Sequence, residues 1–110
     1  MGRFVRGEVV VIPFPFSDLT ATKRRPALVV ADLPGDDVIL CQITSQSPGN
    51  AFAISLTNQD FVTGNLNRPS IIRPERLITA DSHIILRSVG KITDTKLNEV
   101  VAAIKQILTP

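Results

Sequence analysis

The chain has 110 residues, 44% of them hydrophobic, which predicts a single domain, residues 1–110, built around one packed core. This composition excludes intrinsic disorder, and no apolar run approaches the ~18 residues of a membrane span. The formal net charge of +2 permits a nucleic-acid partner without requiring one. A single cysteine, Cys41, excludes an intramolecular disulfide, and no secretory signal pattern is recognisable, so we expect a cytoplasmic protein without a membrane partner.

Short apolar segments separated by turn residues predict a series of β-strands. Several are rich in β-branched residues, too short for helices and bounded by Pro, Gly, Asp or Ser. The predicted strands are residues 9–14, 27–31, 38–43, 51–56, 70–79 and 84–92. We expect the fifth of them to be broken or bulged at Pro74, because proline cannot donate a ladder hydrogen bond. Residues 14–22 and 57–67 have loop composition.

The last segment has a different period. From Thr95 to Leu108 apolar residues recur at spacings of three and four, which predicts one amphipathic helix with Thr93 or Asp94 as its N-cap. Short strands at regular spacing, followed by a helix that must bury its apolar stripe, predict a mainly β fold: a small β-barrel covered by a C-terminal α-helix.

Several kinds of site are poorly supported. Cys41 and His83 are 42 positions apart and do not provide the clustered ligands of a zinc site, so we predict no metal and no cofactor. His83 is better explained as a surface-turn residue than as part of a catalytic triad, and Cys41 as a small core residue than as a nucleophile. There is no glycine-rich phosphate-binding loop.

Several cations of the sequence fall into two groups, which are either solvated surface charges or a binding site for an anionic ligand. In the first group, three consecutive cations end with Arg25, at the expected junction of the loop and the second strand. Guanidinium, hydroxyl and carboxylate groups suffice to cleave RNA, because the 2′-hydroxyl is the nucleophile and arginine stabilises the charge of the transition state. The two groups are Lys23, Arg24 and Arg25, and, within nine residues, Arg68, Arg73 and Arg76.

An ordered set of segments resembles the MazF/PemK family of toxin ribonucleases from type II toxin–antitoxin systems. The segments are residues 13–18, 23–26, 43–46, 69–74 and 89–92, followed by the C-terminal helix. The resemblance implies an SH3-like β-barrel, usually a homodimer, that cleaves single-stranded RNA without metal. Such cleavage leaves a 2′,3′-cyclic phosphate and a 5′-hydroxyl. It also implies a cognate antitoxin with a disordered, acidic tail.

Carried over to this sequence, the resemblance makes Arg25 the principal catalytic group and Thr44 the residue that steadies the scissile phosphate. Arg73 and Glu75 match a catalytic pair of some relatives; the alternative, a strand-edge ion pair without a chemical role, stays open. The expected RNA contacts are Phe16, Asp18, Lys23, Arg24, Ser45, Gln46 and Ser70. Many relatives carry an acidic residue several positions before the arginine, where this chain has Thr20 or nearby Asp18.

Two other functions remain open. One is a poison of a protein target, like the toxin of the same fold that traps DNA gyrase. The other is an inactive module that binds only RNA or an antitoxin. The presence of both Arg25 and Thr44 favours the ribonuclease, because a protein-binding poison does not need that pair.

Overall fold

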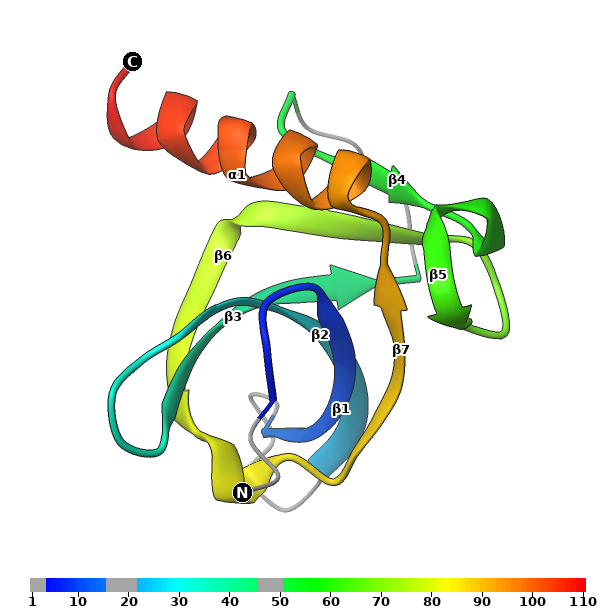
Figure 1. Cartoon of the computed structure of the whole chain (residues 1–110), viewed down its shortest axis with the longest axis vertical. Coiled ribbons are helices and arrows are strands. Elements are labelled where there is room, and N and C mark those ends of the chain that lie inside the picture. Colours follow the sequence, from blue (N-terminus) through cyan, green and yellow to red (C-terminus); the bar gives the residue numbers. More distant parts are fainter. Residues whose placement is uncertain (1–3, 16–21, 46–50) are drawn as a thin grey trace.

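The computed structural model describes residues 4–15, 22–45 and 51–110. Within them the chain forms one antiparallel sheet of seven strands in the order β4-β6-β3-β2-β1-β7-β5, followed by one α-helix (Figure 1). The mainly β fold with a C-terminal helix is therefore confirmed. The elements are β1 (Glu8–Pro15), β2 (Thr22–Asp32), β3 (Asp37–Thr44), β4 (Ile54–Leu56), the 3₁₀ turn η1 (Asn58–Asp60), β5 (Phe61–Gly64), β6 (Ser70–Asp81), the 3₁₀ turn η2 (Ser82–Ile84), β7 (Arg87–Ile92) and α1 (Asp94–Leu108).

The sheet curls into a half-barrel (Figure 1). Its edge strands, β4 and β5, follow each other in the chain and are connected through η1, so one short segment bridges the two edges. β5 reaches β7 through close glycine contacts: a Cβ atom on Gly64 would lie only 2.0 Å from the Val89 carbonyl oxygen. Gly64 also has φ +70°, a conformation that glycine adopts without strain.

The predicted strands are recovered with changes at their ends. Residues 22–26, expected outside the second strand, belong to β2, where they pair with β1. The predicted fourth strand shortens to Ile54–Leu56, the segment 57–67 contains η1 and β5 rather than only loop, and the last strand begins at Arg87 after η2. The charged and polar residues of these segments made them resemble loops, but ladder pairing with neighbouring strands holds them extended.

The interruption at Pro74 is confirmed. Along the β3–β6 ladder the register passes from Cys41↔Leu77 to Gln42↔Arg73, so β6 has three extra residues, 74–76, opposite a single step of β3. This bulge bends β6 and changes the direction in which its side chains point.

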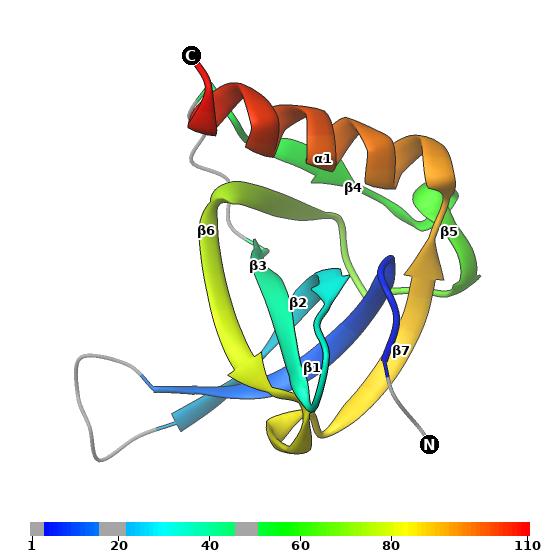
Figure 2. The same ribbon diagram turned by 60° about the vertical axis from the view of Figure 1, so that its left-hand side comes forward.

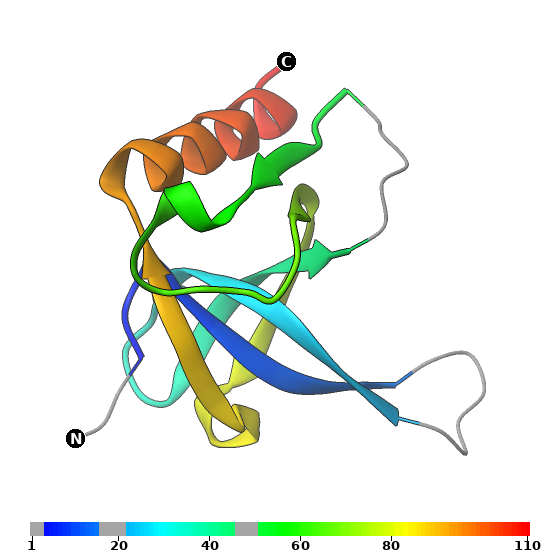
Figure 3. The ribbon, with the colours of Figure 1, turned by 90° about the vertical axis from the view of Figure 1, so that its right-hand side faces the viewer.

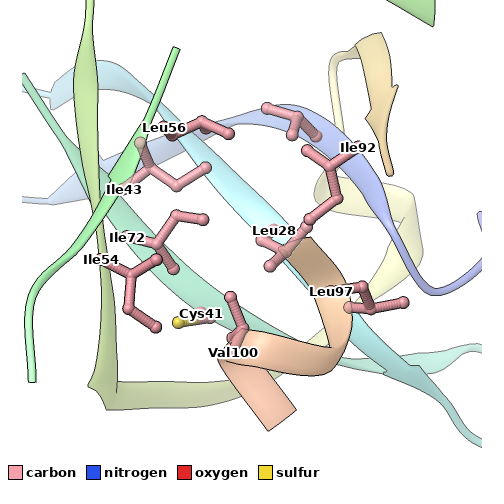
Figure 4. Close-up of a cluster of buried hydrophobic side chains, with 10 residues drawn as sticks. Leu28, Cys41, Ile43, Ile54, Leu56, Ile72, Ile92, Leu97 and Val100 are labelled. Carbon is pink, nitrogen blue, oxygen red and sulfur yellow. The ribbon is translucent and has the colours of Figure 1, made fainter. Parts of the chain in front are cut away.

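Two hydrophobic clusters lie on opposite faces of the central strands. One contains Val10, Ile12, Ala27, Val29, Val38 and Leu40. The other lies between the sheet and α1 (Figure 4) and contains Val9, Leu28, Cys41, Ile43, Ile54, Leu56, Ile72, Ile92, Leu97 and Val100. Strands buried on both faces explain why the sequence shows continuous apolar runs rather than strict alternation.

Helix α1 covers the open side of the half-barrel and packs against β6 (Figure 2). The Thr93 hydroxyl accepts a hydrogen bond from the Lys96 backbone N–H at 3.2 Å, so Thr93 is the N-cap. Leu97 and Val100 are the buried residues of the helix, and both pack in the hydrophobic core. Among the described residues, no helix has the length and apolar character needed to cross a bilayer.

Candidate functional site

A groove with a cavity volume of about 680 Å³ gathers many of the side chains singled out from the sequence. We call it the cationic groove. It is lined by residues of β2, of the end of β3 and of the loop between β5 and β6: Lys23, Arg24, Arg25, Pro26, Ile43, Ser45, Leu66, Asn67, Arg68 and Ser70. Four cations and two serine hydroxyls around one concave surface have the chemistry that suits an anionic, hydrogen-bonding ligand.

The β1–β2 hairpin places the cations of the groove. The paired ends of β1 and β2 project beyond the rest of the sheet (Figure 2, Figure 3). There Lys23 pairs with Phe14, Arg24 with Pro13 and Arg25 with Ile12. Arg25 therefore lies within a strand, not at the loop–strand junction expected from the sequence. Lys23 and Arg24 are exposed and Arg25 is half-buried, because it follows the strand toward the core.

Thr44, Arg73 and Glu75 form a connected group where β3 ends and β6 bulges. Arg73 Nε donates a hydrogen bond to Thr44 Oγ1 at 3.3 Å. Arg73 Nη1 lies 3.7 Å from Glu75 Oε2, and the two side chains are 9% and 24% exposed. β6 lies between β4 and β3, so this is a largely buried ion pair rather than one at the edge of the sheet. A pair this sheltered from water holds its geometry better than a surface pair.

Cys41 ties the bulge to β3. Its buried thiol donates a hydrogen bond from Sγ to the Arg73 carbonyl oxygen at 2.9 Å. Burial, helped by the nearby Glu75 charge, raises the pKa of Cys41 to about 12, although the Arg73 hydrogen bond acts in the other direction. A thiol in this state is a poor nucleophile, which agrees with its predicted role as a core residue.

A smaller cavity of about 220 Å³ adjoins the same region. Four strands line it, and its surface is mostly apolar with three polar side chains. The lining residues are Ile12, Arg25, Pro26, Ala27, Leu40, Gln42, Arg76, Leu77 and Ile78. Arg25 and Pro26 line both this cavity and the cationic groove, so the two spaces lie on either side of β2 at these two residues.

Arg25 and Thr44 lie on the same face of the sheet. Ala27 pairs with Gln42 in the antiparallel β2–β3 ladder. Arg25 lies two positions before Ala27 in β2, and Thr44 lies two positions after Gln42 in β3. Because side chains alternate with a period of two, both project to the face that carries Ala27 and Gln42.

The structure thus brings together most of the residues predicted for the site. The cationic groove holds Lys23, Arg24, Arg25, Ser45 and Ser70, and Thr44, Arg73 and Glu75 form the connected group. Ser70 is 6% exposed and donates to the Arg68 carbonyl at 3.1 Å, so its hydroxyl already has a partner within the loop. Phe16, Asp18 and Gln46 lie outside the described residues.

Sequence reasoning missed Gln42, Asn67 and Leu66 as lining residues, and noted Arg68 and Arg76 only as cations. Gln42 carries a recognisable signal, since it is a polar residue between two fully buried ones in β3. The loop residues carry none, because their position depends on how β5 joins the sheet.

His83 lies apart from this site, in η2. Its Nδ1 is 2.6 Å from Asp81 Oδ1, and the Asp81 carboxylate also accepts from the His83 backbone N–H at 2.9 Å. These contacts lower the pKa of Asp81, and its carboxylate in turn raises the pKa of His83. Both side chains are exposed, as expected for a surface turn. Among the residues that the structure describes, no group of three or more His, Cys, Asp or Glu side chains is placed so that it could hold a metal ion.

Comparison with known proteins gives one family and a consistent fold. Residues 5–108 match the family described as PemK-like, MazF-like toxin of type II toxin–antitoxin system. A search of curated proteins finds no match.

Solved structures with the same fold include an endoribonuclease in complex with its cognate antitoxin from a mycobacterial species, at 17% identity, TM-score 0.75 and 97% coverage of both chains. MazE–MazF from Deinococcus radiodurans matches at 19% identity and TM-score 0.77, covering 96% of this chain and 95% of that one. The Mycobacterium tuberculosis toxin MazF-mt6 matches at 17% identity and TM-score 0.68, covering 90% and 95%. At these identities the structural likeness establishes the fold.

Proposed function

Because the chain belongs to the family of PemK-like, MazF-like toxins of type II toxin–antitoxin systems, we propose that it is the toxin of such a system and a metal-independent endoribonuclease. Its substrate is single-stranded RNA, cut at short sequences. Structures of the same fold that are described as endoribonucleases support this assignment.

The reaction is an internal transfer at phosphorus. The 2′-oxygen attacks the adjacent phosphorus and loses its proton, while the bond to the 5′-oxygen of the next nucleotide breaks and that oxygen gains a proton. The products are a 2′,3′-cyclic phosphate and a 5′-hydroxyl. The chain must orient the two oxygens in line and stabilise the added negative charge.

The cationic groove is the observation that carries this proposal. Lys23, Arg24, Arg25 and Arg68 line one concave surface together with two serine hydroxyls. Cations positioned along a groove bind the phosphates of an RNA backbone, and the Ser45 hydroxyl adds hydrogen bonds to phosphate or sugar oxygens. The Ser70 hydroxyl donates to the Arg68 carbonyl and accepts a hydrogen bond from a ribose hydroxyl. We assign Lys23, Arg24, Ser45 and Ser70 to RNA contacts, with Phe16, Asp18 and Gln46 as further expected contacts.

Arg25 and Thr44 act on the scissile phosphate. Arg25 offers a planar, bidentate donor to the non-bridging oxygens as charge builds up on them. The Thr44 hydroxyl donates to one of these oxygens, in an orientation set by the hydrogen bond from Arg73.

Arg73 and Glu75 complete the site. Glu75 accepts the proton of the 2′-hydroxyl, and Arg73 holds Glu75 on one side and Thr44 on the other. An alternative in which this pair is only structural predicts that Glu75→Gln retains the wild-type cleavage rate, so single-turnover rates of this variant separate the two roles.

The protein acts in the cytoplasm as a homodimer and is held inactive by a cognate antitoxin. Besides Leu77 and Ile78, which line the smaller cavity, six large hydrophobic side chains among the described residues are exposed, which is surface available for a symmetric interface. The antitoxin's disordered, acidic tail folds onto the cationic groove. Sedimentation at micromolar concentration tests the dimer, and a monomer there would contradict it.

The experiment that tests the enzymatic function is incubation of the purified protein with end-labelled single-stranded RNA in EDTA. We expect discrete fragments whose 5′ ends accept phosphate from a polynucleotide kinase without prior dephosphorylation, and whose 3′ ends are cyclic phosphates. Intact RNA, or fragments with 5′-phosphates, would refute the proposed reaction.

A further inference from the structure

We propose that the smaller cavity binds one base of the RNA substrate, next to the cut bond, and that Gln42 reads the identity of that base. This inference rests on the proposed function and adds a specificity-determining residue to it. It follows from three features of the cavity: its position, its lining and the hydrogen-bonding capacity of Gln42.

The position of the cavity is fixed by Arg25 and Pro26, which it shares with the cationic groove. A phosphate held by Arg25 and Thr44 lies on the face of the sheet that carries Ala27 and Gln42, which line the smaller cavity, and its own nucleotide's base is one ribose away. Arg25 also lines the cavity, so a base turned off the backbone path enters it while its phosphate stays with Arg25 and Thr44. Single-stranded RNA allows this, because its bases are not held in a duplex.

The β6 bulge contributes to the lining of the cavity. At the step where Cys41 pairs with Leu77 and Gln42 with Arg73, β6 runs through three additional residues. On the other side of Gln42 the paired residue is Ala27, whose side chain is a single methyl group. The β2 strand therefore leaves room beside the Gln42 side chain, and Arg76 of the bulge lines the space on the β6 side.

The lining suits a planar ring with polar edges. Aliphatic side chains from four strands cover the cavity walls, and Leu77 and Ile78 remain 37% and 40% exposed, which keeps the cavity accessible from solvent. Arg25 and Arg76 also line the cavity and bring two cationic side chains to it. Apolar walls and guanidinium planes pack against the faces of a base.

Gln42 supplies the group that distinguishes bases. It is half-buried between the fully buried Cys41 and Ile43. Its amide makes no side-chain hydrogen bond to the residues described in the structure, which leaves a donor and an acceptor for a ligand. A carboxamide matches the adjacent donor and acceptor on the edge of a base, and such a bidentate contact discriminates strongly between bases.

An apolar side chain of the antitoxin is the competing occupant. The polar lining favours the base, because a purely apolar anchor would leave the half-buried amide of Gln42 without a partner, at a cost in binding.

The test is to sequence the cleavage sites of wild-type protein, Gln42→Leu and Gln42→Glu in a pool of random RNA. Gln106→Leu, which makes the same exchange at an exposed position of α1, is the matched control. We expect Gln42→Leu to reduce base preference at one nucleotide flanking the cut by about tenfold to a hundredfold, with other positions unchanged. Gln42→Glu keeps the shape but only accepts hydrogen bonds, so it should shift that position toward the bases with exocyclic amino groups, adenine, cytosine or guanine, and away from uracil.

The outcomes separate the inference from the proposed function. Active Gln42 variants with the wild-type preference at every position overturn the inference alone, and so does an unchanged preference combined with weakened antitoxin binding, which would assign the cavity to the antitoxin. A wild-type protein that cuts no RNA overturns both. Gln42→Glu retains a polar side chain of the same size, so it serves as the readout if Gln42→Leu folds poorly.

Discussion

Arg73 and Thr44 are joined across neighbouring strands by a hydrogen bond of 3.3 Å from the guanidinium Nε to the threonine hydroxyl. Arg73 is only 7% exposed, and its carbonyl is held in turn by the Cys41 thiol. The Thr44 hydroxyl is thus fixed in direction by a buried cation, which in turn is anchored to the core. In the proposed reaction this hydroxyl donates to the phosphate that Arg25 binds, and a donor held in place before the reaction stabilises the transition state.

Thr44→Val should reduce RNA cleavage by at least tenfold per folded molecule, because it removes the hydroxyl and keeps the shape. It should also cost about 1 kcal/mol of stability, since Arg73 Nε loses its acceptor. Melting temperature and single-turnover rate are measured on the same sample, with Thr63→Val on β5 as the control. A destabilised variant that keeps the full rate per folded molecule would reduce Thr44 to a structural role.

Cys41 should not react with thiol reagents while the protein is folded. Its pKa is raised to about 12, so at pH 8 almost no thiolate is present, and the side chain is fully buried. Because the chain has one cysteine, labelling with a disulfide reagent should follow the rate of unfolding and accelerate with denaturant. Rapid stoichiometric labelling in native buffer would show that the β6 bulge opens readily.

The Asp81–His83 pair should give a bell-shaped contribution to stability against pH. The pKa of His83 is raised, so its contribution is complete below the unfolded value of about 6.5 and is lost as pH rises through the folded pKa. The pKa of Asp81 is lowered, so its contribution is present above the unfolded value and is lost as pH falls through the folded pKa. The melting-temperature difference between wild type and His83→Gln should be largest between about pH 4 and 6.5. A difference that does not change from pH 3 to 9 would contradict this.

Much of the fold can be predicted from local sequence. The helical period of residues 95–108 and the β-branched runs of β1, β2 and β3 are local signals that tertiary packing reinforces. β5 could not be predicted, because Phe61–Gly64 is held extended by distant contacts such as the close approach of Gly64 to Val89. Bulging at Pro74 could be predicted, but not the three-residue shift of register that follows.

In the candidate site, too, some features can be predicted from the sequence and others depend on tertiary contacts. Resemblance to a family identifies Arg25 and Thr44. That they share a face of the sheet depends on the β2–β3 register, which the sequence does not specify. The place of Gln42 in the site was not predicted, because a glutamine in a strand can be recognised as a cavity-lining residue only once the packing of the neighbouring strands is known.

The antitoxin should compete with RNA for the cationic groove. Charge reversal by Arg24→Glu should slow association with the antitoxin's acidic tail, mainly at low salt, because exposed charges steer encounter and are screened as ionic strength rises. Lys105→Glu on α1 is the matched control and should leave association unchanged. An antitoxin that binds with equal affinity while RNA occupies the groove would place its binding surface elsewhere.

The central claim is that Arg25 carries the chemistry of RNA cleavage, and the most direct test is the single-turnover cleavage rate of Arg25→Ala in EDTA. Wild-type melting behaviour and circular dichroism establish that the variant is folded. We expect the rate to fall by about 10²–10³ or more, and Arg25→Lys to restore little of it, because an ammonium lacks the planar pair of donors. A folded Arg25→Ala protein that cuts RNA at the wild-type rate would contradict the account.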